Sequence, residues 1–346
     1  MHPDLAARLK LDEAAEVAKI SRRLRELLAR HLHRRGLVVA ISGGVDSAVC
    51  SALAVRAVGA DRVFGLLMPE RDSASTSMVR GRYVVEKLGI AHEESDIAPA
   101  LDALGCYRWR DEAIRHVFPD YGTGWRNKIV IAGGQSGSFN YFKLVVQSPD
   151  GLVYEKRLDP RNYLQIVAAT NFKQRVRKSM EYFHADRLNY AVVGTPNRLE
   201  YDQGFFVKNG DGSADVKPIA HLYKTQVYAL ARFLELPEDV CNALPTTDTY
   251  SMVQGQDEFY FALPYDKMDI ALLACNQGEP PSILAAELGI HVSQAESIYR
   301  DIAAKRRTTA MLHWPAIPLE EVSGPNAKPP SPDLLESYGS FGGVHQ

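Results

Sequence analysis

An apolar run over residues 37–42 is followed at once by two glycines and then by a helical pattern. A continuous apolar run of this length is typical of a parallel strand that is buried on both faces. The glycines allow the tight turn that a strand needs when it leads directly into a helix. This succession of strand, turn and helix predicts a protein with α/β architecture.

The same alternation of apolar runs and helical patterns continues along the chain. Further strands are predicted over 63–70, 91–97 and 190–195, and helices over 11–34, 75–88 and the stretch before residue 190. Alternating strands and helices are typical of a doubly wound, mostly parallel, Rossmann-like sheet. Beyond residue 222 the pattern is helical, with segments over 222–233, 265–276, 283–288 and 293–306. The predicted fold is therefore α/β with a helical C-terminal part.

Residues 106–160 interrupt this alternation. Apolar runs over 142–147 and 152–157 flank the turn-forming sequence Ser-Pro-Asp-Gly at 148–151, which predicts a β-hairpin. Residues 128–132 are a candidate third strand. We interpret the whole stretch as a β-rich insertion that serves as a lid, as a partner surface or as simple decoration.

The length and the local composition indicate how the chain is divided. A chain of 346 residues allows one large domain or two ordinary ones. Because the α/β pattern resumes after the insertion, we predict a single domain over 1–320. Residues 321–346 are rich in proline, glycine and serine, and we expect them to form an extended or disordered tail.

Charge and hydropathy exclude several classes of protein. The 40 Lys and Arg residues nearly balance the 42 Asp and Glu residues, which leaves a formal net charge of −2. This balance argues against nucleic acid or an anionic membrane as the main partner. No apolar run reaches the roughly 18 residues that a membrane-spanning helix needs. The four cysteines form no CxxC pair, which suits a reducing compartment, and we expect a cytoplasmic protein.

The end of the first predicted strand has the composition of a phosphate-binding loop. Two glycines, two hydroxyl groups and a helix N-terminus meet there, and each suits a bound phosphate. The residues are Ser42, Gly43, Gly44, Val45, Asp46 and Ser47. The Asp46 carboxylate would repel a phosphate unless a cation lay between them, which predicts Mg²⁺. The spacing fits neither a Walker A loop nor a GxGxxG loop, and the alternative is an ordinary strand–turn–helix with polar caps.

The sequence SGGVDS after an apolar strand resembles the pyrophosphate loop of the N-type ATP pyrophosphatases. The resemblance implies an adenine nucleotide alpha-hydrolase-like fold. A second segment, over 194–227, resembles the ammonia-dependent NAD synthetases within this group. Further pieces of that family match in the same order at 171–177, 245–248 and 256–258. The resemblance covers roughly 11–96 and 165–314, and it leaves out the insertion and the tail.

The resemblance implies roles for individual residues. The implied catalytic residues are Asp46, Glu200 and Lys224, of which Asp46 and Glu200 would bind Mg²⁺. The implied ATP contacts are Ser42, Gly43, Gly44, Asp46, Ser47, Thr195, Lys224 and Thr246. The implied deamido-NAD contacts are Arg175, Lys208, Asp215 and Lys305. Arginine and lysine suit a dinucleotide pyrophosphate or a carboxylate, whereas Asp215 lies in a turn-rich stretch where support of the turn is the alternative.

The implied reaction has two steps. ATP adenylates a carboxylate, that of the nicotinate in deamido-NAD, and pyrophosphate is released. Ammonia, either free or from a separate glutaminase, then displaces AMP and forms the amide of NAD. The resemblance also implies a homodimer.

Three departures from the family pattern concern the acceptor side. Ala304 stands where the family commonly has a histidine, Ser213 replaces a customary glycine, and the insertion precedes the helix that carries Arg175. These departures leave open an alternative, a specialised paralogue that adenylates a different carboxylate and forms another amide or C–N bond. A non-catalytic nucleotide-binding protein on the same fold is a further alternative.

Overall fold

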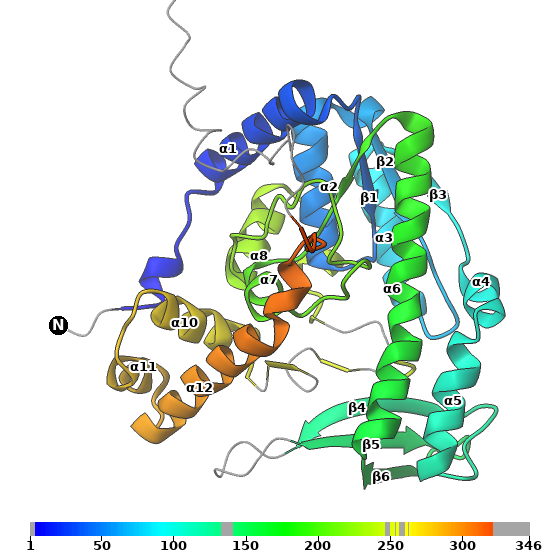
Figure 1. The fold of residues 1–346 in the computed structure, drawn as a ribbon. Helices are drawn as coiled ribbons and strands as arrows, with labels where there is room; N and C mark the ends of the chain where they lie inside the picture. The colour runs from blue at the N-terminus through cyan, green and yellow to red at the C-terminus, as the bar shows by residue number, and fades with distance from the viewer. Residues whose placement is uncertain are drawn as a thin grey trace, which may run out of the picture.

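A computed structural model describes residues 4–132, 141–245, 250–252, 254–255, 260–261 and 263–320 (Figure 1). Its centre is a sheet in the order β3–β2–β1–β7, in which each neighbouring pair of strands is parallel. The strands are β1 (Leu37–Ala40), β2 (Val63–Leu67), β3 (Ala91–Glu94) and β7 (Ala191–Val193). They lie where the sequence predicts them, and the parallel sheet is confirmed.

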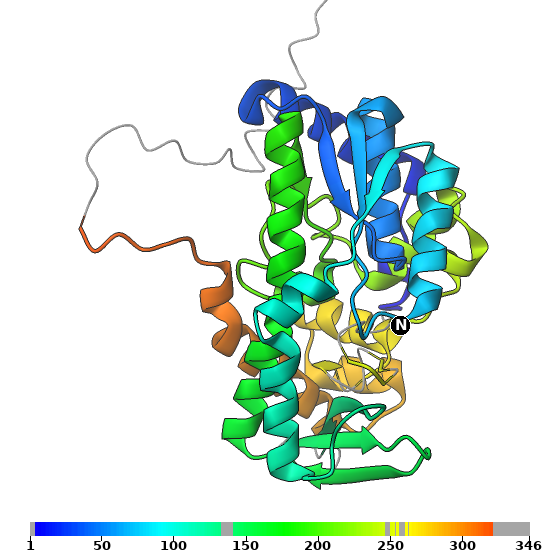
Figure 2. The ribbon, with the colours of Figure 1, turned by 90° about the vertical axis from the view of Figure 1, so that its right-hand side faces the viewer.

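Helices cover both faces of this sheet (Figures 1 and 2). On one face lie α1 (Glu13–Glu26), α2 (Val45–Val58), α3 (Ser75–Leu88) and α8 (Lys224–Phe233), and on the other α4 (Ala98–Ala103), α5 (Cys106–Val117) and α6 (Pro160–Leu188). Leu37 and Val39 belong to the first core, whereas Val38 between them belongs to the second. Because successive strand side chains point to opposite faces, burial on both faces explains the continuous apolar run of β1. The predicted doubly wound arrangement is confirmed.

The chain between α5 and α6 forms a second, antiparallel sheet in the order β4–β5–β6. Its strands are β4 (Arg126–Ala132), β5 (Tyr141–Gln147) and β6 (Val153–Arg157), so the predicted hairpin and third strand are confirmed. Ile129, Leu144 and Val146 of this sheet form a core of their own with apolar residues of α5 and α6.

The stretch 106–160 is not β-rich throughout, because α5 occupies its first part. Tyr107, Arg110 and Ile114 recur on the buried face of this helix at helical spacing. The arginine hides the pattern, because it interrupts what would otherwise be an apolar stripe. Arg110 can be buried because it forms ion pairs with Asp72 and Asp111.

The C-terminal part is helical, as the sequence predicts. The predicted segments correspond to α8, α10 (Tyr265–Asn276), α11 (Pro281–Leu288) and α12 (Val292–Thr309), whereas the short helices α7 (Arg198–Gln203) and α9 (Glu238–Cys241) were not predicted. Short 3₁₀ turns lie at Ala7–Leu9, Ala60–Arg62 and Ala310–His313, and a π-helical turn at Leu27–Leu32 extends α1. Among the described residues, none of the helices has the length and apolar character to cross a membrane. The predicted tail over 321–346 lies outside the described residues, and the domain boundaries stay a prediction.

Candidate active site

The predicted phosphate-binding loop follows β1 and opens α2. Gly43 has a φ angle of +78°, and a Cβ atom at this position would lie 2.1 Å from the carbonyl oxygen of Ser77. The site therefore requires glycine. Ser47 Oγ donates a hydrogen bond to the carbonyl oxygen of Gly44 at 3.0 Å and lies 3.2 Å from Ser42 Oγ. These contacts hold a tight turn at the N-terminus of α2, where free N–H groups favour an anion.

A cavity of about 790 Å³ lies at the carboxyl ends of β1, β2 and β7, the place where open α/β sheets bind ligands. Its lining includes ten residues selected from the sequence: Ser42, Gly44, Asp46, Ser47, Arg175, Thr195, Glu200, Lys208, Lys224 and Lys305. Gly43 packs against Ser77 behind this lining, and Asp215 is not among the described lining residues. Thr246 lies outside the described residues.

An ion pair joins the loop to the predicted lysine. Lys224 Nζ contacts Asp46 Oδ2, and the lysine side chain is 2% exposed. Burial by itself would lower the pKa of Lys224, but the negative charges of Asp46 and Glu200 outweigh this effect and raise that pKa above its usual value. Lys224 is therefore a permanent positive charge at the wall of the cavity.

Asn197 connects the two carboxylates that the resemblance assigns to Mg²⁺. Its Nδ2 donates to Asp46 Oδ1 at 3.1 Å, and its Oδ1 accepts from the backbone N–H of Glu200 at 3.2 Å. Its own backbone N–H donates to Glu200 Oε2 at 3.1 Å, which completes a capping box at the start of α7. Sequence analysis did not select Asn197, although an asparagine three residues before a glutamate is the signature of such a box.

A buried carboxylate on α10 holds the start of α8. Asp269 is 0% exposed and accepts hydrogen bonds from the backbone N–H groups of Lys224 at 3.1 Å and Thr225 at 2.7 Å. Burial raises the pKa of Asp269 to about 6. This carboxylate places the first turn of α8, and with it Lys224, relative to the cavity. No local pattern links the two residues, because 45 positions separate them in the chain.

Three of the four predicted acceptor contacts border the same cavity. Arg175 lies on α6, and its Nε donates to the backbone carbonyl of Lys208 at 3.4 Å. Lys305 lies on α12 and pairs with Asp301 at 2.7 Å. Burial lowers the pKa of Lys305, and the charge of Asp301 opposes this effect. The structure thus gathers cations from α6, α12 and the loop after α7 around one cavity.

Asp215 has a different environment. Its Oδ2 accepts from the backbone N–H of Val192 at 2.7 Å, and its Oδ1 accepts from the hydroxyl of Tyr182 at 3.4 Å. These bonds tie the turn-rich stretch to β7 and fit the structural alternative. Contact of Asp215 with deamido-NAD stays a prediction.

A buried carboxylate, Glu181, and a partly buried one, Asp211, were not selected from the sequence. Glu181 on α6 pairs with Lys178 at 2.7 Å, and Asp211 accepts from the backbone N–H of Val207 at 2.8 Å. Burial raises the pKa of both carboxyl groups, and both line the cavity. The Gly-Asp-Gly sequence around Asp211 was an available signal, whereas Glu181 lies in a helix with no local motif.

The donor atoms around the loop suit Mg²⁺. The carboxylates of Asp46 and Glu200 and the hydroxyl groups of Ser42 and Thr195 line one cavity. Mg²⁺ prefers oxygen ligands and is commonly bound by one or two carboxylates together with substrate phosphates and water. Within the part of the chain that the structure describes, no group of three or more His, Cys, Asp or Glu side chains could hold a metal ion by itself. The carboxylates therefore fit a cation that is bound partly by the protein and partly by the phosphates of a substrate.

Comparisons with known proteins agree with this geometry. The family model described as NAD synthase matches residues 16–117 and 140–309. An NH3-dependent NAD+ synthetase from Rhizobium meliloti is 56% identical over 318 residues, which are 91% of this chain and 95% of that protein. One from Thermotoga maritima is 36% identical over 247 residues, which are 71% of this chain and 82% of that protein.

Solved structures with similar folds are more distant in sequence. An NH3-dependent NAD synthetase from Campylobacter jejuni aligns with a TM-score of 0.59 at 21% identity and covers 90% of this chain and 100% of its own. An NMN synthetase from Francisella tularensis aligns with a TM-score of 0.61 at 20% identity and covers 89% of this chain and 99% of its own. At these identities the two structures show a shared fold. The family model and the curated relatives, which span most of the sequence, show that the chain belongs to the NAD synthase family.

Proposed function

We propose that this protein is an ATP-dependent, amide-forming ligase that converts deamido-NAD to NAD. In the first step, a carboxylate oxygen of the nicotinate attacks the α-phosphorus of ATP and pyrophosphate leaves. In the second step, ammonia attacks the acyl carbon, the bond to AMP breaks, and the nitrogen loses a proton as the amide forms. One observation carries the proposal: the SGGVDS loop with Lys224 and the cations Arg175 and Lys208 line the same cavity.

The polar groups of the loop and Lys224 suit the first step. The hydroxyl groups of Ser42 and Ser47 and the free N–H groups at the start of α2 would bind the phosphates. Negative charge grows on pyrophosphate as it leaves, and a positive charge fixed at that place stabilises the transition state. Because its pKa is raised, Lys224 keeps this charge throughout the neutral range. The two steps require no covalent enzyme nucleophile.

Asp46 and Glu200 are the proposed ligands of Mg²⁺. When bound, the ion would neutralise part of the phosphate charge. Asn197 supports this assignment because it hydrogen bonds to both residues and so holds their side chains in one relative orientation. Thr195, which also lines the cavity, and Thr246 remain proposed ATP contacts.

Deamido-NAD is the proposed acceptor, bound by Arg175, Lys208 and Lys305, with Asp215 as a further proposed contact. The relative from Rhizobium meliloti, whose name is NH3-dependent NAD+ synthetase, matches nearly the whole chain. Such relatives support this acceptor and not the alternative of a specialised paralogue, in spite of the change at Ala304. Their names also favour free ammonia as the nitrogen source, with a separate glutaminase as the second candidate.

We also propose a homodimer in the cytoplasm. Leu164 and Phe183 on α6 are 63% and 58% exposed, which suits contact with a second subunit along this helix. All four cysteines are free, which suits a reducing compartment. Light scattering of the purified protein would give the number of subunits.

Product analysis tests the proposed reaction. The protein is incubated with ATP, Mg²⁺, ammonium and deamido-NAD, and NAD, AMP and pyrophosphate are measured by mass spectrometry. Equal amounts of the three products are expected, and Asp46→Asn should reduce all three together. Absence of NAD from protein that binds ATP would contradict the proposed acceptor. A second reaction with glutamine in place of ammonium should yield no NAD, because the proposal places no glutaminase activity in this chain.

A further inference from the structure

Strand β4 lies in the stretch 118–139, which the NAD synthase family model leaves unmatched. Along one edge β4 pairs with β5, from Arg126 opposite Gln147 to Ala132 opposite Tyr141. Along its other edge it meets the loop between α9 and α10, of which residues 242–245, 250–252, 254–255, 260–261 and 263–264 are described. This stretch of the sequence contains the predicted ATP contact Thr246 and is called here the α9–α10 loop.

Hydrogen bonds attach the α9–α10 loop to β4. The backbone N–H of Asn127 donates to Ser251 Oγ at 2.8 Å, and the backbone carbonyl of Asn127 accepts from the N–H of Met252 at 3.1 Å. Arg126 Nε donates to the carbonyl oxygen of Ser251 at 2.8 Å, and the side chain of Gln254 donates to the carbonyl oxygen of Ile129. Asn127 and Ile129 are two positions apart, and their backbone groups both face the edge that is not paired with β5. The loop therefore follows this edge much as a further strand would.

The side chains at this contact are buried. Asn127 is 0% exposed, and its Nδ2 donates to the hydroxyl of Tyr121 at 2.7 Å and to Ser251 Oγ at 3.4 Å. Tyr250 belongs to the core formed by α5, α6 and the antiparallel sheet. Tyr250 also lines the active-site cavity, together with Leu244 and Pro245 of the same loop. The inserted strand and the cavity wall are therefore in contact through this loop.

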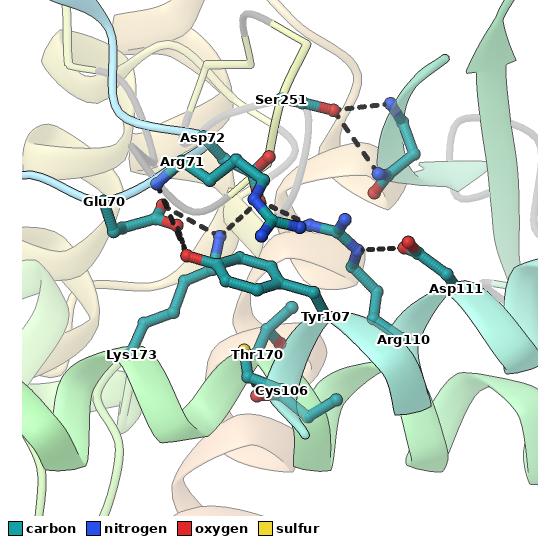
Figure 3. Close-up of polar contacts among 12 residues, drawn as sticks. Glu70, Arg71, Asp72, Cys106, Tyr107, Arg110, Asp111, Thr170, Lys173 and Ser251 are labelled. Carbon is teal, nitrogen blue, oxygen red and sulfur yellow. Dashed lines mark hydrogen bonds and ion pairs between the residues drawn. The ribbon is translucent and has the colours of Figure 1, made fainter. Parts of the chain in front are cut away.

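A strand can position a loop only if the strand itself is fixed. Buried ion pairs join α5 and α6, whose apolar side chains share a core with the inserted sheet, to the segment after β2. Figure 3 shows the Lys173 ammonium between Glu70 and Asp72, at 3.0 and 2.7 Å. Arg110 pairs with Asp72, and the Tyr107 hydroxyl donates to Glu70 at 2.8 Å. Glu70 and Asp72 follow β2, whereas Tyr107 and Arg110 lie on α5, the helix that precedes β4 in the chain.

This arrangement is costly to break. Removing one member of a buried ion pair leaves a charge without a partner in a medium of low polarity. Lys173 is 0% exposed and contacts two carboxylates, so α5, α6 and the segment after β2 are held in one relative position. The inserted sheet is thereby joined rigidly to the elements that carry the nucleotide side of the cavity.

We propose that β4 is a positioning element of the active site, in which Asn127 and Ser251 hold the α9–α10 loop where Leu244, Pro245 and Tyr250 border the cavity. The proposal rests on the proposed function only in taking ATP as the ligand of that cavity. This positioning role differs from the three uses named above for the insertion, which are a lid, a partner surface and decoration. Asn127 is a positioning residue, since it acts through the loop.

Hydrogen exchange of the full-length protein tests the structural half of the proposal. Ser251→Ala and Asn127→Ser each remove side-chain bonds, and Asn127→Ser is the milder change at a buried position. The peptide that covers residues 250–255 should exchange about tenfold faster in each variant, as loss of one buried hydrogen bond implies. Glu155→Gln is the matched control, because the exposed Glu155 lies on β6 of the same sheet and pairs only with Lys143 among the contacts described. Unchanged exchange in both loop variants would overturn the proposal.

Calorimetric titration with Mg²⁺ and ATP tests the functional half, in the same proteins and in the Asn127→Ser/Ser251→Ala double variant. If a variant positions the loop in only a fraction of the molecules, the apparent dissociation constant of ATP should equal the wild-type value divided by that fraction. Exchange that reaches the unprotected rate with an unchanged dissociation constant would overturn the proposal. If the wild-type protein bound no ATP, the proposed function would fail, and the exchange rates would still decide whether β4 positions the loop.

Discussion

Lys224 and Asp46 form an ion pair although 178 positions separate them in the chain. Each residue lies in the first turn of its helix, Lys224 in α8 and Asp46 in α2, and the two helices pack on the same face of the sheet. The pair therefore closes the cavity wall at the place where two helix N-termini meet. Both members are held by other groups, Asp46 by Asn197 and the backbone of Lys224 by Asp269.

Lys224→Met keeps most of the length of the side chain and removes its charge. We expect the rate of NAD formation at saturating substrates to fall by at least about 100-fold, because a fixed charge that opposes the developing negative charge is lost. Lys224→Arg is the matched variant, which keeps the charge but presents it as a planar fork. It should lose less activity than Lys224→Met. Equal rates in Lys224→Met and the wild-type protein would refute the role of this lysine.

Gly43→Ala should destabilise the protein. The left-handed backbone at Gly43 and the 2.1 Å approach of a Cβ atom to the carbonyl oxygen of Ser77 demand movement of the backbone. A loss of about 1–3 kcal/mol in the free energy of unfolding is expected. At Gly44 the φ angle is −87° and a Cβ atom would meet only Ser42 Oγ, at 3.3 Å, so Gly44→Ala is the control. Urea unfolding of both variants makes the comparison, and equal destabilisation would contradict it.

Asn197→Ala should weaken Mg²⁺ binding. A residue that orients metal-binding carboxylates typically contributes about 10–100-fold to metal affinity. The measurement is the Mg²⁺ concentration that gives half of the maximal increase in thermal midpoint at fixed ATP, which does not depend on turnover. Asn197→Ser retains an oxygen that can cap α7 and lacks the donor to Asp46, so it isolates that bond. Unchanged Mg²⁺ dependence in Asn197→Ser would show that the bond to Asp46 does not matter.

Asp269 should make stability depend on pH in the acid range. Burial raises the pKa of Asp269 from 3.8 to about 6, so the folded protein holds this proton more tightly than the unfolded chain does. The contribution of the protonated carboxyl to stability is full below about pH 4 and is lost as the pH rises through about 6. Hydrogen bonds from Thr225 and Lys224 and the charge of Lys224 lower this pKa, and burial outweighs them.

The Asp269→Asn variant provides the reference for this measurement, because an amide does not titrate. The free energy of unfolding of the wild-type protein, minus that of Asp269→Asn, should decrease between about pH 4 and about pH 6. Urea unfolding at several pH values gives this difference. A difference that is constant, or that increases with pH, would show that the carboxyl has no raised pKa.

Local patterns predicted the central sheet and the phosphate-type loop, because their determinants lie within a few residues of one another. The apolar run of β1 shows burial on both faces, and the glycines of the loop show the turn that follows. The family resemblance added residues from distant segments, and most of them line one cavity. Two residues are exceptions. Asp215 accepts a backbone hydrogen bond from β7 and is not among the described lining residues, and Thr246 lies outside the described residues.

The contacts that sequence analysis missed are long-range and polar. Asp269 on α10 accepts hydrogen bonds from the first two residues of α8, and nothing in the sequence of either helix indicates this contact. Helix α5 was missed because Arg110 interrupts its apolar face, and that arginine is tolerated through Asp72, which follows β2. The contact of β4 with the α9–α10 loop could not be predicted, because backbone hydrogen bonds along a strand edge leave little trace in residue type.

Helix α6 connects the two sheets mechanically. Its 29 residues correspond to a length of about 43 Å, and Figures 1 and 2 show it running from the parallel sheet to the antiparallel sheet. Ile166 near one end and Ala185 near the other belong to different cores, and Arg175 lies between them. The helix contains no glycine and no proline beyond Pro160, so it has no hinge. The helix therefore holds the parallel and antiparallel sheets at a fixed separation beside the cavity. Acceptors of different size would have to be accommodated by loops and not by movement of the two sheets apart.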